Sequence, residues 1–170
     1  QNNRNRPYDA YFEQSDIERG YMGRVGRQMG NAGGVMGRFD GLWGGYNVNP
    51  EWRVNGVVGV PVEFNSTIKR NFYGVSVDFL PQPEKITGSN YFIEQHTAGV
   101  VDRQAVGMEV RYFDNVKNIF GLLDYDTVFK AVNIAMAQGN WQMDFGSNFF
   151  FLADHRKSPM LLITGALQGE

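Results

Sequence analysis

The sequence has two histidines, and one of them lies near a serine. Such a pair could support nucleophilic catalysis. His155 lies in the stretch DHRKSP, three residues before Ser158, and the other histidine is His96. A serine nucleophile needs an adjacent base and, in many hydrolases, a strained turn that exposes its hydroxyl group. Ser158 lies in no such turn motif, and a turn rich in charged residues needs no catalytic explanation. We therefore expect no catalytic residue and no enzyme activity.

Asp124 and Asp126 form a second constellation that could do chemistry. Two residues apart in an extended strand, they point to the same face, where paired carboxylates could exchange a proton or hold a cation. The alternative is that both are solvated in a polar interior or pair with Arg111 across a hairpin. We favour this second interpretation and expect neither a metal site nor a cofactor.

Composition excludes other classes of function. The chain has 170 residues, a formal net charge of -2, 21 glycines and no cysteine. The absence of cysteine removes disulfide frameworks and thiolate metal sites. The small net charge, without a basic patch interleaved with aromatic residues, argues against a nucleic-acid partner. The glycines of GGVMGRFDG lack the lysine and serine of a phosphate loop.

The elements that must position these residues are β-strands, because turn-forming residues recur at short spacing. No stretch approaches the roughly 18 apolar residues of a membrane-spanning helix. We expect an all-β fold with about ten antiparallel strands, near residues 21–28, 35–46, 52–64, 72–79, 91–96, 105–113, 119–126, 131–137, 140–145 and 149–154.

The expected organisation is a polar arm or loop over residues 1–20, followed by a β-barrel domain over residues 21–170. The chain begins without an initiator methionine or a signal peptide and ends in LLITGALQGE, without a terminal aromatic residue. We therefore expect it to be part of a longer chain.

Alternation within the strands separates two faces. Along residues 52–64, one face carries Trp52, five alternate small or branched apolar residues and Phe64, while Arg53 and Glu63 lie on the other face. The expected lipid-facing girdle comprises Trp43, Trp52, Phe64, Tyr73, Phe79, Tyr112, Tyr125 and Trp141. The expected lumen-lining residues are Arg38, Asp40, Arg53, Glu63, Asp78, Glu94, Glu109, Arg111, Asp124 and Asp126.

Two observations favour lipid outside and water inside. The basic residues of the polar face are all arginine. Arginine without lysine is more typical of a confined interior with cross-strand pairs than of an open aqueous surface. The row from Trp52 to Phe64 would be about 40 Å long, or about 30 Å high at a strand tilt of about 40°. That height matches the hydrocarbon core of a bilayer. Acids outnumber arginines on this polar face, so an open lumen would favour cations.

Several segments resemble porin-type outer-membrane proteins of Gram-negative bacteria. RVGRQ at 24–28, followed by GGVMGRFDGLWGGY at 33–46, resembles their Gly-Arg-Gln strand and the strand after it. VGMEVRYFD at 106–114 and FGLLDYDTVF at 120–129 resemble their hairpins. The style is similar to the barrel part of large outer-membrane proteins that carry periplasmic helical repeats. This resemblance implies an antiparallel, up-and-down transmembrane β-barrel, or a large part of one.

The expected function is therefore non-enzymatic, in the bacterial outer membrane. The barrel would form a water-filled path for transport or anchor an envelope or export assembly. Its partners would be outer-membrane lipid and other envelope proteins or further copies of itself, and no nucleic acid. A soluble β-barrel binding an apolar ligand is the alternative. A third candidate is an outer-membrane lipid hydrolase that uses Ser158 and His155.

Overall fold

Ten strands make up the regular structure of the described residues. The computed structural model describes residues 9–30, 34–35, 37–62, 69–81, 85–143 and 146–157. The strands are β1 (Ala10–Asp16), β2 (Tyr21–Gly30), β3 (Gly37–Asn47), β4 (Trp52–Pro61), β5 (Arg70–Phe79), β6 (Ile86–Thr97), β7 (Val100–Phe113), β8 (Lys117–Asp126), β9 (Ala131–Gln142) and β10 (Asn148–Arg156).

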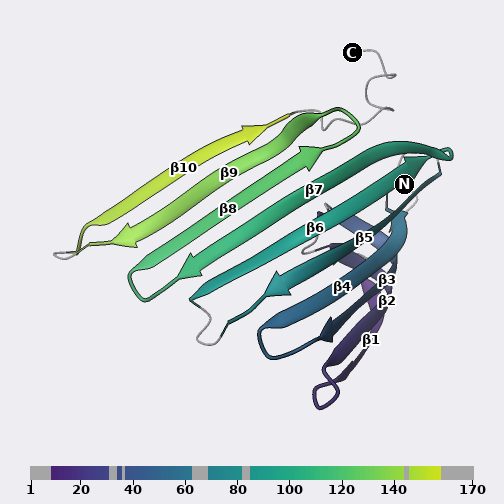
Figure 1. Cartoon of the computed structure of the whole chain (residues 1–170), viewed down its shortest axis with the longest axis horizontal. Helices are drawn as coiled ribbons and strands as arrows, with labels where there is room; N and C mark the ends of the chain where they lie inside the picture. The colour runs from purple at the N-terminus through teal and green to yellow at the C-terminus, as the bar shows by residue number, and fades with distance from the viewer. Residues whose placement is uncertain are drawn as a thin grey trace, which may run out of the picture.

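The strands form one antiparallel sheet in which every strand pairs with its neighbours in sequence, from β1 to β10 (Figure 1). The prediction of an all-β, up-and-down fold is confirmed. Within the described residues β1 and β10 are the two edges of the sheet, so closure into a barrel stays a prediction. No helix in the described ranges is long and apolar enough to cross a membrane, a finding that does not bear on strands.

The expected strands differ from the observed ones at four places, one of which is β7, which begins at Val100 rather than near residue 105. The expected polar arm over residues 1–20 is wrong in part, because Ala10–Asp16 pairs with β2 as β1. The expected strands at 131–137 and 140–145 are one strand, β9, which continues through Gly139. β6 begins at Ile86, inside a segment expected to be a turn. The number of strands agrees because one error adds a strand and another removes one.

The hairpin end of the sheet is the end at which β1 is followed by β2, β3 by β4, β5 by β6, β7 by β8 and β9 by β10, and its described turns include 17–20, 48–51 and 114–116. The turn between β7 and β8 shows how local polar groups fix them. The Tyr112 hydroxyl group and the backbone amides of Val116 and Lys117 all donate to the Asp114 carboxylate. These bonds lower the pKa of Asp114, the Tyr112 bond most strongly.

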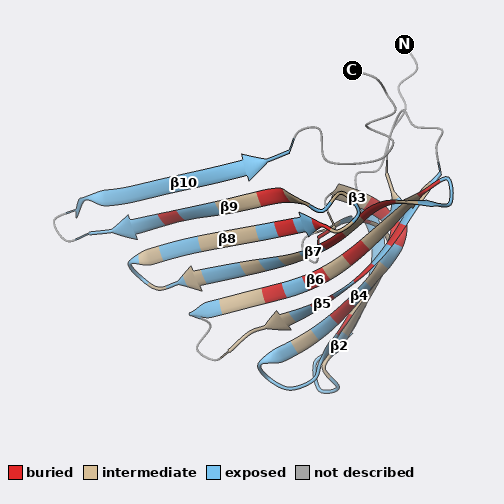
Figure 2. Cartoon of the chain, turned by 45° about the horizontal axis from the view of Figure 1, so that its top comes forward, coloured by how far each residue is buried: buried red, intermediate tan, exposed pale blue. Residues whose placement is uncertain are grey.

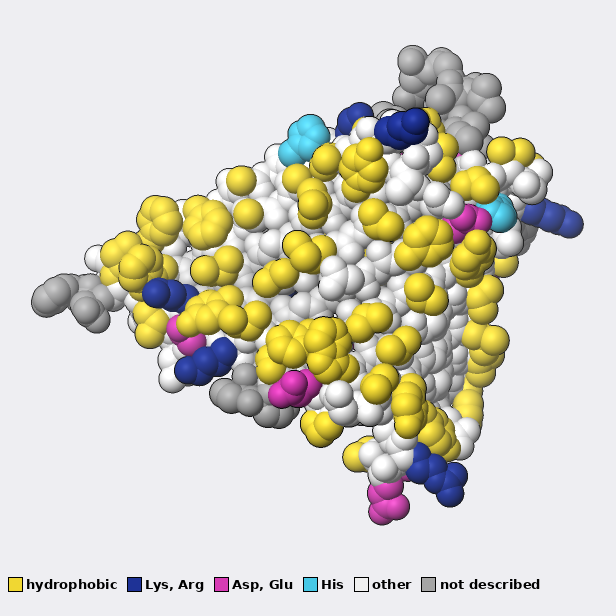
Figure 3. Space-filling view, viewed as in Figure 1, with side chains coloured by type: hydrophobic (Ala, Val, Ile, Leu, Met, Phe, Trp, Pro, Cys, Tyr) yellow, Lys and Arg dark blue, Asp and Glu magenta, His cyan; other side chains and the backbone are white. Residues whose placement is uncertain are grey.

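The sheet is curved, so it has a convex and a concave face. Figures 1 and 2 show β6–β10 spread as a broad layer, with β1–β3 turning away behind β4 and β5. On β4 the exposed convex residues alternate with less exposed concave ones. Cross-strand pairing places Val54 beside Val77 and Val58 beside Tyr73, so the convex apolar row continues onto β5. Figure 3 shows this face, where hydrophobic side chains cover the strands and charged ones lie mostly near the margins.

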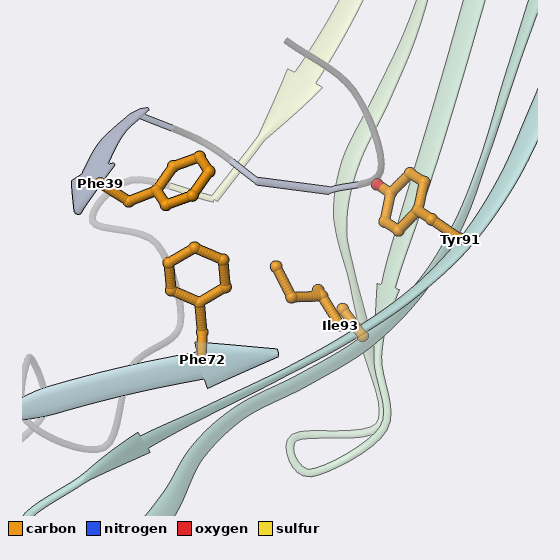
Figure 4. Packing of buried hydrophobic residues seen from close by; sticks show 5 residues of the cluster. Phe39, Phe72, Tyr91 and Ile93 are labelled. Carbon is orange, nitrogen blue, oxygen red and sulfur yellow. The ribbon is translucent and has the colours of Figure 1, made fainter. Parts of the chain in front are cut away.

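The concave face holds the apolar core. Phe39, Phe72, Tyr91, Ile93 and Ala105, from β3 and β5–β7, are each at most 5% exposed (Figure 4). The rings of Phe39 and Phe72 meet edge to face, with their centroids 5.2 Å apart. Because these side chains come from strands on both sides of β4, their contact depends on the curvature of the sheet.

A row of three glycines lies on the concave face where the strands bend. Gly26 pairs with Gly41, and Gly41 pairs with Gly59. A Cβ atom on Gly41 would lie 2.1 Å from the carbonyl oxygen of Val58, and one on Gly26 would lie 2.4 Å from that of Ala10. Neighbouring backbones therefore approach too closely for any side chain, as at the inside of a bend. We call Gly26, Gly41 and Gly59 the glycine crease.

Three β3 residues and one β6 residue lie on the opposite face from the one expected. Arg38 and Asp40 lie on the convex face, because pairing places Asp40 beside Val60. Glu94 lies there too, beside Tyr73. Trp43, expected in the lipid-facing girdle, lies on the concave face beside Val57. The expectation failed because the interior also needs apolar side chains, and Phe39 and Tyr91 fill it.

The glycine crease predicts a difference between two glycines of the same strand. Gly41→Ala would force a methyl group against the Val58 carbonyl group and should lower the free energy of unfolding by about 1–3 kcal/mol. Gly44→Ala, on the convex face, would place its methyl group 3.7 Å from the Met22 carbonyl oxygen and should change the free energy of unfolding by less than about 0.5 kcal/mol. Urea unfolding followed by tryptophan fluorescence would measure both. Equal effects would contradict a steric role for the crease.

Candidate functional site

A deeply buried ion pair lies on the concave face. Arg103 of β7 donates from Nη2 to Oδ2 of Asp124 on β8 over 2.7 Å, and the two side chains are 5% and 0% exposed. The Tyr91 hydroxyl group donates to the same carboxylate oxygen over 2.7 Å. Arg103 also donates from Nη1 to the carbonyl oxygen of Gly34, which follows β2. One guanidinium group thus connects three distant parts of the chain.

Asp126 and Asn133 lie beside this ion pair and are fully buried. Oδ1 of Asp126 accepts hydrogen bonds from the backbone amides of Val128 and Phe129, which fixes the turn into β9. Its Oδ2 has no hydrogen-bond partner, and neither polar atom of the Asn133 side chain has one. Asn133 belongs to an irregularity in the β8–β9 register, next to the pair of Asp124 with Ile134.

A second polar group lies on the concave face nearer the hairpin end. Asn55 donates from Nδ2 to the Ser76 hydroxyl group over 3.0 Å and to Oδ2 of Asp78 over 2.7 Å. Ser89 donates to Oδ1 of Asp78 over 2.7 Å. Beside Asp78 lies a shallow cavity of about 250 Å³, whose lining includes Thr87, Ser89, Glu109 and Arg111. The concave face at this end is therefore polar and hollowed.

The predicted lumen-lining residues divide into three groups. Arg53, Asp78, Glu109 and Arg111 lie on the concave face, and Asp124 and Asp126 also do but are fully buried. Arg38, Asp40 and Glu94 lie on the convex face instead. Glu63 lies outside the described residues.

Neither arrangement expected for the two aspartates is present, because both are fully buried rather than solvated and Arg111 pairs with neither. Arg111 pairs in register with Phe120, and its guanidinium carbon lies 5.2 Å from the centre of that ring. Its nearest carboxylate contact is with Glu109 at 3.8 Å. The partner of Asp124 is Arg103, which lies on the same strand as Arg111 but nearer the start of β7.

The concave face carries acids and arginines in similar numbers. The acids on it are Glu13, Asp78, Asp102, Glu109, Asp124, Asp126 and Asp154. The arginines on it are Arg24, Arg53, Arg70, Arg103, Arg111 and Arg156. The sequence indicated an excess of acids on this face for two reasons. Asp40 and Glu94 were expected there although they face outwards, and several arginines that lie there were not expected. No lysine lies on the concave face of a described strand.

The convex face has an aromatic row at the hairpin end and a polar belt toward the other end. The row contains the expected Trp52, Phe79, Tyr112 and Trp141, and also three unexpected residues, Tyr21, Tyr46 and Phe149. Tyr73 and Tyr125 lie on this face nearer the opposite end, and Phe64 is outside the described residues.

The polar belt consists of an ion pair and a hydrogen-bonded cluster. Arg27 and Asp40 pair at 2.7 Å. Glu94 accepts from the Tyr73 hydroxyl group over 2.7 Å and from Nε2 of Gln104 over 2.6 Å, and it contacts Nε2 of His96 at 2.8 Å. These charged groups satisfy one another at one margin of the apolar band.

The histidines do not form a catalytic arrangement among the described residues. His96 lies on β6 and His155 on β10, which are not neighbouring strands. His96 contacts Glu94, and Ser158 lies outside the described residues. Over the described ranges, no group of three or more His, Cys, Asp or Glu side chains could hold a metal ion.

Sequence reasoning missed Arg103, Tyr91 and Asn133. Tyr91 is not among the expected lumen-lining residues, although its hydroxyl group could have indicated a buried polar contact. Arg103 lies in the unexpected first part of β7, in a segment left between strands. Asn133 interrupts an apolar stretch, AVNIAMA, and that interruption was the available signal.

No protein-family model matches the chain, and neither a curated protein nor a solved structure matches it.

The buried ion pair predicts unequal effects of two arginine substitutions on β7. Arg103→Met would leave the Asp124 carboxylate buried without its counter-charge and should lower the free energy of unfolding by about 3–5 kcal/mol. Arg111→Met, whose side chain is 62% exposed, should cost less than about 1 kcal/mol. Chemical unfolding of both variants measures the difference. A larger loss from Arg111→Met would contradict the assignment of Arg103 as the interior brace.

Proposed function

We propose that the chain forms the wall of an outer-membrane-type β-barrel, with its convex face against lipid and its concave face against a polar interior. Its role would be non-enzymatic: a water-filled path, or the membrane anchor of an envelope assembly. The location in a bacterial outer membrane rests on this arrangement and on the resemblance of the strands at 24–46 and 106–129 to porin-type proteins.

The observation that carries this proposal is the pattern of the convex face. Exposed apolar residues from successive strands form a continuous band, which includes Val54, Val58, Val75, Val77 and Met108. A contiguous exposed apolar surface of this extent is rare in soluble monomers and indicates contact with lipid or protein. The aromatic row at one margin and the polar belt at the other match the two boundaries that lipid imposes.

The height of the band is compatible with a thin bilayer. On β4 the apolar row runs from Trp52 to Val60, about 26 Å along the strand at about 3.3 Å per residue. With a tilt of about 40° the height is about 20 Å, somewhat below the roughly 25 Å typical of outer-membrane barrels. The value is smaller than the sequence indicated, because Asp40, beside Val60, marks the polar margin.

The interior supports two variants of this role. The hollowed polar region beside Asp78 and Glu109 favours water at the hairpin end. The apolar core around Phe39 and Phe72 favours a narrowed interior toward the other end. A narrow interior suits an anchor or a restrictive path more than a wide general pore.

The soluble alternative requires the apolar row of β4 to face the interior of a barrel. Those residues lie on the convex face instead, with Val58 and Val60 each 50% exposed. A lipid hydrolase would need Ser158 near a histidine, and nothing in the described residues supports that pairing. We therefore keep the non-enzymatic membrane role.

Arginine scanning of the two faces tests the proposal. Val58→Arg places a charge in the middle of the convex band and should cost about 2–4 kcal/mol in lipid, seen as a lower folded fraction in vesicles. Gln138→Arg, on the exposed concave side of β9, should fold like the parent. In a soluble protein Val58→Arg would be harmless, because the side chain is already half exposed. Full folding of Val58→Arg without detergent or lipid would therefore overturn the proposal.

Ion selectivity tests the variant in which the interior conducts. The near balance of acids and arginines on the concave face predicts a cation-to-anion permeability ratio close to one in planar bilayers. A strong cation preference would contradict this prediction and restore the acidic lumen indicated by the sequence. A folded, inserted protein without measurable current would exclude the path and favour the anchoring role.

A further inference from the structure

The buried polar residues of β8 and β9 carry more negative charge than the positive charge next to them can neutralise. Asp124 and Asp126 are both 0% exposed. Arg103 pairs with Asp124, whereas Asp126 makes no ion pair within the described residues and is held only by two backbone amides. A fully buried carboxylate without a counter-charge is strongly destabilising unless another charge reaches it.

The same part of β8 and β9 contains several buried polar atoms that have no hydrogen-bond partner. Oδ1 of Asp124, Oδ2 of Asp126 and both polar atoms of the Asn133 side chain are buried without a hydrogen bond. Buried polar atoms are paired in the great majority of proteins, so several together on neighbouring strands call for a common partner. Three of these four atoms are oxygens.

The β8–β9 register brings these residues to one face. Asp124 pairs with Ile134 and Asp126 pairs with Ala131, and the shift between these pairs leaves Asn133 opposite the interval between the two aspartates. Asn133 is 0% exposed, as both aspartates are, so all three side chains are covered by protein. The candidate donor set is therefore two carboxylate oxygens and one amide oxygen at neighbouring positions of two paired strands.

We propose that Asp124, Asp126 and Asn133 bind a hard divalent cation, with Ca²⁺ as the best match. Calcium takes carboxylate and amide oxygens, and the absence of histidine and cysteine ligands argues against softer transition metals. A second positive centre beside Arg103 compensates the charge of Asp126. Because only two carboxylates contribute, we expect a dissociation constant of about 10⁻⁴–10⁻³ M. The proposal does not depend on the lipid-facing role of the convex face.

Thermal unfolding with and without calcium tests the site. The purified chain, folded in detergent, should unfold at a lower temperature in EDTA than in millimolar Ca²⁺. Asp126→Asn retains Oδ1 for the turn amides but removes the charge, and it should weaken calcium binding at least about tenfold. Asp78→Asn is the matched control, because it removes a concave carboxylate near the hairpin end and should leave the calcium response unchanged.

Terbium gives a second readout, because Tyr91 lies within hydrogen-bonding distance of Asp124 and can sensitise Tb³⁺ emission. Asn133→Asp adds a third carboxylate and should tighten Tb³⁺ and Ca²⁺ binding at least about tenfold. The proposal is overturned if the parent protein unfolds at the same temperature in EDTA and in Ca²⁺. It is also overturned if Asp126→Asn binds as tightly as the parent, or if Asp78→Asn removes the response equally.

Discussion

The close approach of three backbones at the glycine crease is the constraint on which the rest of the structure depends. Without side chains at Gly26, Gly41 and Gly59, the strands β2–β4 can bend sharply toward the concave side. The bend lets Phe39 of β3 reach Phe72 of β5, and it gives the sheet an inside. A flat sheet of the same sequence would expose this aromatic pair, and its two faces would not differ in burial.

Curvature then decides what each face must contain. Inside the bend, space is limited, so Phe39, Phe72 and Ile93 fill it, and polar groups remain only where they are paired. Tyr91 joins the two regions, because its ring belongs to the apolar core while its hydroxyl group bonds to Asp124. The dry core and the buried ion pair are therefore parts of one packed interior, and substitutions in either region should affect the other.

The sequence allowed the fold class and most strand positions to be predicted, because turn residues and alternation are local signals. It also identified the outward row of β4 and β5 correctly, since Val54, Val58, Val75 and Val77 alternate with polar or small residues. It failed at Asp40, Trp43 and Glu94, where both alternate sets mix apolar and polar residues. There the face is decided by cross-strand register and by the crease, and neither can be read from one strand alone.

The same limit applies to the candidate site. Asp124 and Asp126 could be recognised as a pair on one face, but their burial, the Arg103 partner and the position of Asn133 depend on two register shifts, at Gln95–His96 and at Asp124–Tyr125. Such irregularities re-aim side chains and are frequent at functional positions. The prevalence of arginine over lysine on the concave face has a related cause. A planar guanidinium group can bond a carboxylate and a distant carbonyl oxygen at once, as Arg103 does with Asp124 and Gly34. An interior braced in this way resists the opening that a wide aqueous channel would need, which is why the packing of the concave face favours a narrow path or an anchor.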